Sequence, residues 1–314
     1  PPPPPPPPFF FSTPPRESPM LRSLVGSEMC IRDRSTGKGQ PIIFVHEFAG
    51  DYRSCEPQIN YFSRYNKCIS FCARGYPPSE VPENESSYSQ ERAWRDILSV
   101  MDNLKIEKAH IVGLSMGGFA TLHLGINAQD RVLSLVVAGC GYGAIPIDKT
   151  NFNKEADFSN ISLDSAKIIL NEGMDKFGSE YALGPSRVQF QNKDPKGWQL
   201  FNDQLIKHDP VGSANTLLGV QNKRPNLYSL EKEISGITCP TLIINGDEDD
   251  MCLEVGLYLK RTIKTAGLLI VPKTGHTINL EEPDLFNNHL LKFFTAVNSS
   301  SWGSRDKRAK IIKF

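Results

Sequence analysis

A serine set between glycines is the residue of this chain best suited to nucleophilic chemistry. It is Ser115, in segment 113–118 (GLSMGG), which follows an apolar run at 109–112 and precedes a helix-like run at 119–124. A serine with glycine on each side at a strand-to-helix reversal is the nucleophile-elbow pattern, G-x-S-x-G. Glycine lets the strand and the helix approach without a Cβ clash, and the strained turn presents Oγ to a substrate carbonyl. We therefore expect Ser115 to be a catalytic nucleophile.

The serine needs a base, and His276 is the histidine best placed to be one. A serine hydroxyl is a poor nucleophile at neutral pH unless a base lies within hydrogen-bonding distance. His276 follows the last expected strand, at 267–271, so it should lie at the carboxyl edge of the sheet, where parallel sheets bind ligands. His110, His123 and His289 fall inside expected strands or helices, and we expect them to be packed or surface residues.

A carboxylate that orients the base is expected in the acidic run 247–250 (DEDD). The run follows the strand at 241–245 and should lie at the same edge as the serine and the histidine. Such a carboxylate fixes the tautomer of the histidine and stabilises its imidazolium form. We assign this role to Asp249, which is far enough along the turn to reach the sheet edge. Asp247 and Asp250 remain alternatives.

Acyl transfer also needs two hydrogen-bond donors for the oxyanion. The elbow supplies one of them, the backbone N–H of Met116, because this residue follows the nucleophile. The second donor should come from the loop that ends the strand at 41–46 and reads HEFAG at 46–50.

Short apolar strands alternate with amphipathic helices from about residue 40 onward. The strands are continuous Ile/Val/Leu-rich runs, as expected when both faces of a strand are covered. This alternation is typical of an α/β fold, with a mostly parallel sheet flanked by helices. We expect strands at 41–46, 67–72, 109–114, 132–138, 241–245 and 267–271, and helices at 54–63, 89–104, 116–127 and 283–294.

The alternation stops between residues 144 and 234. This segment is polar and helix-prone, and it is too long to be a loop in a compact domain. We expect a helical cap at 144–234, inserted between the two parts of one core at 35–143 and 235–297. A flexible tail should follow at 298–314.

The first thirty-four residues differ from the rest of the chain. They begin with eight prolines and show neither helical nor strand periodicity, so we expect disorder. Residues 15–34 also resemble translated sequencing-adapter DNA, and we treat 1–34 as non-native and exclude them from the fold. The alternative, a proline-rich ligand for an SH3-like partner, is disfavoured because no basic residue flanks the proline tract.

The composition argues against several classes of partner. Lys plus Arg and Asp plus Glu number 35 each, so no charge excess indicates nucleic acid or an anionic membrane. The chain contains no run of 18 apolar residues, the length needed to span a bilayer. Seven cysteines without metal-ligand spacing favour reduced thiols, no metal site and a cytoplasmic protein. We expect a small-molecule substrate, and the oligomeric state stays open.

Five segments resemble the α/β-hydrolase superfamily, in order, over residues 40–295. They are the 46–50 loop, 74–79 (RGYPPS), the serine elbow, the turn at 246–249, and 275–276 (GH) followed by 282–283 (EP). The chain order serine, aspartate, histidine is also that of these enzymes. The set is similar to the esterase, lactonase and haloperoxidase-like branch, which uses no cofactor and carries a helical cap. By that resemblance Phe48 N–H is the second oxyanion donor.

Two departures from the family pattern stand out. Glu47 occupies a position where the family usually has glycine, and its charge would oppose an oxyanion if it pointed inward. We expect it to point away or to pair with a cation such as Arg53. The family fold also begins with two strands before the one at Ile42, where this chain has the foreign-looking segment. We expect these first strands to be missing from the sheet.

These residues predict a serine hydrolase of the carboxylic ester hydrolase type (EC 3.1.1), which cleaves an ester, lactone or related carbonyl through an acyl-enzyme. Dehalogenases and epoxide hydrolases of the same fold use an aspartate at the elbow, so Ser115 counts against them. Two alternatives remain. One is C–C bond hydrolysis or perhydrolysis with the same triad, and the other is a non-catalytic receptor for a small molecule.

Overall fold

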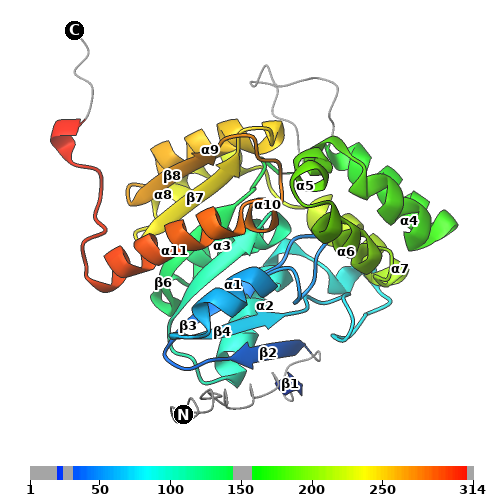
Figure 1. Ribbon diagram of the computed structural model, residues 1–314, viewed down its shortest axis with the longest axis horizontal. Coiled ribbons are helices and arrows are strands. Elements are labelled where there is room, and N and C mark those ends of the chain that lie inside the picture. The colour runs from blue at the N-terminus through cyan, green and yellow to red at the C-terminus, as the bar shows by residue number, and fades with distance from the viewer. Residues whose placement is uncertain (1–19, 24–30, 144–157, 310–314) are drawn as a thin grey trace, which may run out of the picture.

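An eight-stranded sheet forms the centre of the molecule in the computed structural model, which describes residues 20–23, 31–143 and 158–309 (Figure 1). The strand order is β1-β2-β4-β3-β5-β6-β7-β8, and all neighbours from β4 to β8 are parallel. The strands are β1 (Met20–Ser23), β2 (Arg32–Thr36), β3 (Gln40–Val45), β4 (Asn66–Phe71), β5 (Ala109–Leu114), β6 (Val132–Ala138), β7 (Thr241–Gly246) and β8 (Ala266–Val271). The six predicted strands are confirmed to within one residue at each end.

Helices cover both faces of this sheet, because the strands are apolar on both sides. One apolar cluster joins one face to α2 (Gln90–Asn103), α3 (Met116–Asn127), α8 (Glu231–Ser235) and α9 (Asp250–Thr262). A second cluster joins the other face to α1 (Glu56–Phe62), α10 (Ile278–Glu281) and α11 (Pro283–Asn298). The four predicted core helices are confirmed, with ends shifted by up to four residues. No helix was predicted at α9 and α10, while α8 lies at the end of the segment predicted to be helical.

A group of helices packs over the loops at the carboxyl ends of the strands (Figure 1). It consists of α4 (Phe158–Ala182), α5 (Val188–Lys193), α6 (Pro195–Leu205), α7 (Pro210–Asn215) and the π-helical turn η4 (Thr216–Gln221). A third apolar cluster joins these helices to Phe48, Tyr76 and Met116 of the core loops. The helical character predicted for 144–234 holds for 158–234, while 144–157 lie outside the described residues.

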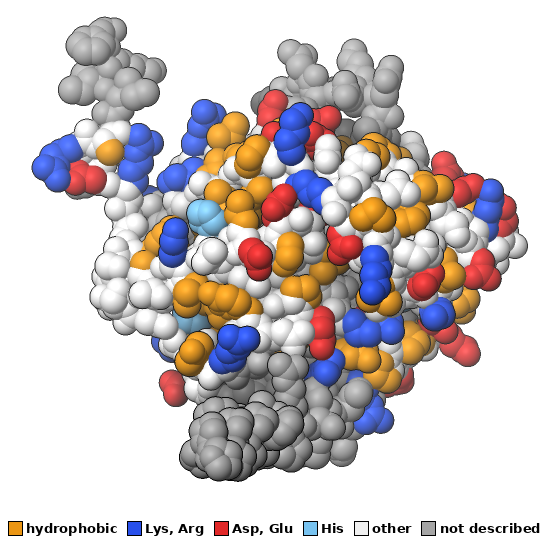
Figure 2. Space-filling view, in the orientation of Figure 1, with side chains coloured by type: hydrophobic (Ala, Val, Ile, Leu, Met, Phe, Trp, Pro, Cys, Tyr) orange, Lys and Arg blue, Asp and Glu red, His pale blue; other side chains and the backbone are white. Residues whose placement is uncertain are grey.

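Short 3₁₀ turns complete the described chain. They are η1 (Glu85–Ser87), η2 (Gln129–Arg131), η3 (Pro185–Arg187), η5 (Leu227–Leu230) and η6 (Lys307–Ala309). None of the described helices is long and apolar enough to cross a membrane. On the face drawn in Figure 2, acidic and basic side chains are interspersed over the described surface.

Both chain ends depart in part from the expected disorder. The short strand β1 pairs with β2, and β2 pairs antiparallel with β4, so disorder does not hold for 20–23 and 32–34. Where the first strands were expected to be missing, the sheet edge holds these two short strands, and 1–19 and 24–30 lie outside the described residues. In the expected tail, Trp302 packs on Phe293 at a ring distance of 4.6 Å and donates to the Thr265 carbonyl at 2.8 Å.

Candidate active site

Ser115 lies in the strained turn between β5 and α3. Its backbone has φ 54° and ψ −113°, a combination that non-glycine residues rarely adopt. The Ser115 N–H donates to the Ala138 carbonyl at 2.8 Å, which ties the turn to the end of β6. The serine side chain makes no capping hydrogen bond to α3. The hydroxyl is therefore not hydrogen-bonded to the first turn of the helix that follows it.

The glycines around Ser115 allow close backbone contacts, as the sequence pattern predicted. A Cβ on Gly113 would lie 2.1 Å from the Gly117 carbonyl oxygen. A Cβ on Gly117 would lie 2.1 Å from the Val45 carbonyl oxygen and 2.7 Å from that of His46. The start of α3 is thus pressed against the end of β3 and the loop that follows it.

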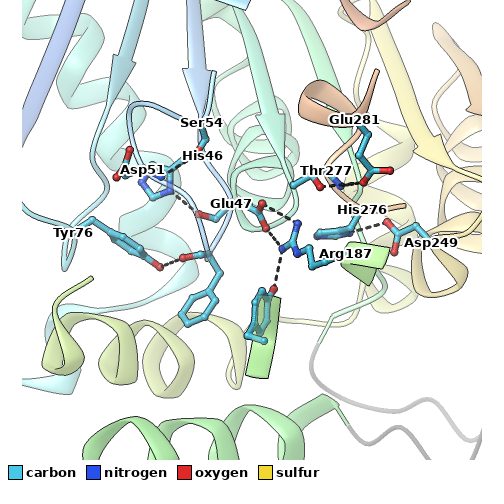
Figure 3. A network of polar contacts seen from close by, with 12 residues as sticks. His46, Glu47, Asp51, Ser54, Tyr76, Arg187, Asp249, His276, Thr277 and Glu281 are labelled. Carbon is cyan, nitrogen blue, oxygen red and sulfur yellow. Dashed lines mark hydrogen bonds and ion pairs between the residues drawn. The ribbon is translucent and has the colours of Figure 1, made fainter. Parts of the chain in front are cut away.

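His276 and Asp249 form a hydrogen-bonded pair (Figure 3). The histidine Nδ1 lies 2.7 Å from Asp249 Oδ2. Asp249 lies in the loop after β7, and His276 lies in the loop after β8. The two alternative acids make other contacts. Asp247 Oδ1 accepts from the Thr274 N–H at 3.2 Å, and Asp250 is exposed at the start of α9.

The pairing changes the proton affinity of both groups. Burial disfavours the charged form of each, but the opposite charge and the shared hydrogen bond outweigh it. The pKa of Asp249 is therefore lowered and the pKa of His276 is raised. With Nδ1–H donated to the carboxylate, Nε2 of His276 remains the nitrogen that can accept a proton.

The His276 ring lies above the ends of β5 and β6, beside the serine turn. A Cβ on Gly139, the residue after β6, would lie 3.3 Å from His276 Cε1 and 3.3 Å from Leu114 Cδ1. Leu114 directly precedes Ser115, and the N–H of Ser115 is bound to the residue before Gly139. The structure thus brings Ser115, His276 and Asp249 to one edge of the sheet.

Glu281 holds the loop that carries His276, and the sequence analysis missed it. Its carboxylate accepts from the Gly275 N–H at 2.6 Å, the Thr277 N–H at 2.9 Å and Thr277 Oγ1 at 3.0 Å. These donors flank His276 on both sides in the chain, and Figure 3 shows the contact between Glu281 and Thr277. Burial raises the pKa of Glu281. Its position at the end of α10, an element not predicted, gave no sign of this role.

His46 orients the peptide group that carries the Phe48 N–H. Its Nε2 lies 3.0 Å from the Ala73 N–H, which can only donate, so Nδ1 carries the proton. Nδ1–H donates to the Glu47 carbonyl at 2.6 Å, and burial lowers the pKa of His46. Because the Glu47 carbonyl and the Phe48 N–H belong to one planar peptide, this bond also fixes the direction of the N–H.

The other side of Phe48 and the start of α3 complete the donor arrangement. Tyr76 Oη donates to the Phe48 carbonyl at 2.9 Å. Met116 is the first residue of α3, so its N–H has no partner within the helix. Both N–H groups predicted to bind the oxyanion thus belong to backbone segments in mutual contact beside Ser115.

Glu47 pairs with a cation, as expected, but the cation is Arg187 of the cap and not Arg53. Arg187 Nη1 lies 3.0 Å from Glu47 Oε1 and Nη2 lies 2.5 Å from Oε2 (Figure 3). Arg53 instead binds Asp51, two residues earlier in the same turn, with Nε 3.0 Å from both carboxylate oxygens. Arg53 binds Asp51 because the two residues lie in the same turn, and no sequence pattern indicates that residues 47 and 187 are in contact.

Three side chains at this edge could also coordinate a metal ion. Asp249, Cys252 and His276 offer ligand atoms that lie within 4.8 Å of one another. Two of these atoms are joined in the hydrogen bond described above. The expectation that the protein uses no metal and no cofactor stays a prediction.

Comparisons with known proteins agree with this fold. Residues 40–283 match the family model of the alpha/beta hydrolase fold. A 3-oxoadipate enol-lactonase from Acinetobacter baylyi is 24% identical over 85% of this chain and 93% of its own length. A 2-hydroxy-6-oxononadienedioate/2-hydroxy-6-oxononatrienedioate hydrolase from Comamonas testosteroni is 26% identical over 85% and 92%. A thermophilic esterase structure from Thermogutta terrifontis superposes with a TM-score of 0.76 at 21% identity, covering 88% of this chain and 99% of the esterase.

The match covers the elements that carry the site. Hydrolases are among the relatives, and Ser-His-Asp triads with oxyanion holes are typical of the fold. The chain belongs to the α/β-hydrolase fold family.

Proposed function

We propose that this protein is a serine hydrolase that cleaves an ester, a lactone or a related carbonyl compound, as carboxylic ester hydrolases do. The observation that carries the proposal is the 2.7 Å contact between His276 and Asp249, beside a serine held at φ 54°. The names of the enol-lactonase and the esterase above support this substrate class. The substrate would be a small molecule bound beneath the cap.

The geometry supports a two-step reaction. Ser115 Oγ attacks the carbonyl carbon while His276 Nε2 takes its proton, and Asp249 stabilises the imidazolium. The oxyanion accepts hydrogen bonds from the N–H groups of Phe48 and Met116. His276 then gives its proton to the leaving alcohol as the acyl-enzyme forms. A water molecule, deprotonated by His276, attacks the acyl-enzyme and releases the acid and Ser115.

C–C bond hydrolysis is the second candidate, and the Comamonas testosteroni relative favours it. It would use the same three residues on a substrate whose leaving group is a stabilised carbanion. Perhydrolysis and a non-catalytic receptor on the same fold are further alternatives.

A fluorophosphonate probe and a substrate panel test these proposals. We expect covalent labelling that is lost in Ser115→Ala, together with turnover of members of an ester, thioester and lactone panel. Turnover of a vinylogous 1,5-diketone, whose conjugated double bond stabilises the carbanion that leaves, with no ester turnover would favour the C–C hydrolase. Labelling at Ser115 without any turnover would favour the receptor, and absence of labelling would contradict all catalytic alternatives.

We also propose the domain limits stated above and a cytoplasmic location. The six cysteines in the described part of the chain are all free thiols, and burial raises the pKa of Cys55, Cys68, Cys72 and Cys140 to about 12. Buried, protonated thiols are typical of proteins of reducing compartments.

A further inference from the structure

We infer that the Glu47–Arg187 pair selects the substrate: the site takes acyl groups that carry no charge but offer an acceptor oxygen to Nε of Arg187. The inference rests on the proposed function, because it assigns a substrate class to the same active site. It concerns Glu47, at which this chain departs from the family pattern, and Arg187, a partner that the sequence did not predict.

The pair lies between the two halves of the proposed catalytic machinery. Glu47 directly precedes Phe48, whose N–H is the predicted oxyanion donor. Arg187 directly follows Ser186, whose carbonyl accepts from the His276 N–H at 3.2 Å. In Figure 3 the Arg187 side chain lies between the Glu47 carboxylate and the His276 ring. The ion pair therefore adjoins both the loop with the predicted oxyanion donor and the proposed base, and we place the acyl group of the substrate next to it.

The guanidinium of Arg187 is buried and only partly used. Its side chain is 0% exposed and that of Glu47 is 2% exposed. The two Nη atoms donate to Glu47, and Nη2 also lies 3.1 Å from Tyr181 Oη. Among the described residues, Arg187 Nε–H has no acceptor. A buried donor without an acceptor is unfavourable, so a substrate oxygen at this position would gain a hydrogen bond.

The charge of the pair determines which oxygen can bind there. Glu47 already neutralises Arg187, and the Asp249 carboxylate is buried beside His276. A substrate carboxylate would add another negative charge against Glu47 where water cannot screen it, which is strongly unfavourable. An ester, ketone or ether oxygen accepts the same hydrogen bond without this repulsion.

Three matched substrates test the inference on the unmodified protein. They are 4-nitrophenyl hydrogen adipate, 4-nitrophenyl methyl adipate and 4-nitrophenyl octanoate. All three share the leaving group, and the last two also have acyl chains of the same length. We expect kcat/KM for the methyl ester to exceed that for the free acid by about tenfold or more, the usual effect of an unfavourable charge or a lost charged hydrogen bond. It should also exceed that for the octanoate, which offers no second oxygen.

Variants of the pair should change this preference in opposite directions. Glu47→Gln leaves the charge of Arg187 uncompensated, so the ratio should move about tenfold toward the free acid. Arg187→Gln leaves Glu47 uncompensated, so the ratio should move toward the methyl ester. Arg53→Gln removes an equal charge from the same loop and should leave the ratio unchanged. A loss of stability common to both variants cannot shift the kcat/KM ratio in opposite directions. Melting temperatures would measure such a loss separately.

The outcomes separate this inference from the proposed function. If neither these three esters nor any member of the wider ester, thioester and lactone panel is turned over in a Ser115-dependent way, the proposed function fails. If other panel members are turned over but none of these three is, only the inference is overturned. If the three esters are hydrolysed but the unmodified protein prefers the free acid, or treats all three alike, only the inference is overturned. The comparison of the three esters uses only the unmodified protein, so it tests the inference even if a variant fails to fold. Shifts of both variants in the same direction would also overturn the inference.

Discussion

At the scale of single residues, the Asp249 carboxylate determines the protonation of His276. Burial alone lowers the pKa of a histidine, but the charge of Asp249 and its hydrogen bond raise that of His276 above its ordinary value. The histidine must be neutral to take the serine proton. Activity should therefore fall as the pH drops through this raised pKa, which gives kcat/KM an acidic limb at a higher pH than a free histidine would give.

Replacement of Asp249 by asparagine should move that limb and reduce the rate. Without the carboxylate, the pKa of His276 falls and the acidic limb of kcat/KM shifts to lower pH. The rate at neutral pH should decrease by about 10³- to 10⁴-fold, because the imidazolium loses its partner and the tautomer is no longer fixed. The measurement is kcat/KM between pH 5 and 9 on the most reactive ester.

The matched control is Asp250→Asn, which removes the same charge from the neighbouring exposed position. Its pH profile should equal that of the unmodified protein. A larger loss in Asp250→Asn than in Asp249→Asn, or an acidic limb that stays in place in Asp249→Asn, would contradict the assignment of the acid.

At the scale of elements, the serine turn exists because β5, α3 and the loop after β3 meet without side chains between them. Gly113 and Gly117 face backbone oxygens at distances that no Cβ could occupy. Backbone atoms cannot move aside as a flexible side chain can, so each added methyl group must displace an element. The close packing also brings the Met116 N–H beside the loop that carries Phe48.

Gly117→Ala should therefore separate α3 from β3 and disturb the oxyanion donors. We expect a loss of stability of about 2 kcal/mol or more, in the range found for overpacking, and a fall in kcat even where the protein still folds. Urea denaturation and ester turnover measure the two effects. The control is Gly141→Ala, whose added Cβ would meet only the Met251 carbonyl oxygen at 3.7 Å, an ordinary contact. Equal effects of the two substitutions would contradict this account.

The elements also show how much of the molecule can be predicted from its sequence. The six strands follow from their continuous apolar runs, and the juxtaposition of Ser115, Asp249 and His276 follows from the rule that parallel strands end at one edge. The Glu47–Arg187 pair does not, because its partners are 140 residues apart and meet only through the packing of the cap. Glu281 was missed for a different reason: its contacts are local but depend on a short helix that periodicity does not reveal.

At the scale of the whole molecule, the buried His110 and His208 and the partly buried His123 make the stability of the fold depend on pH. Burial lowers the pKa of His110, His123 and His208 to about 4, from an ordinary value of 6.5. They lie in β5, in α3 and before α7, so the effect is spread over the core and the cap. Between pH 6.5 and about 4 the unfolded chain binds protons at these positions that the folded chain does not.

The folded state should therefore lose stability as the pH falls through this window. Each pKa unit corresponds to about 1.4 kcal/mol, so each histidine can contribute up to about 3 kcal/mol. We expect a lower urea midpoint at pH 5 than at pH 7.5, and a smaller difference in His123→Leu, which keeps an apolar contact with Phe119 but cannot take up a proton. Asp249 and Asp51 do not produce this effect, since their lowered pKa values make them titrate below the window. A midpoint independent of pH, or an unchanged difference in His123→Leu, would show that these histidines are protonated without cost in the folded protein.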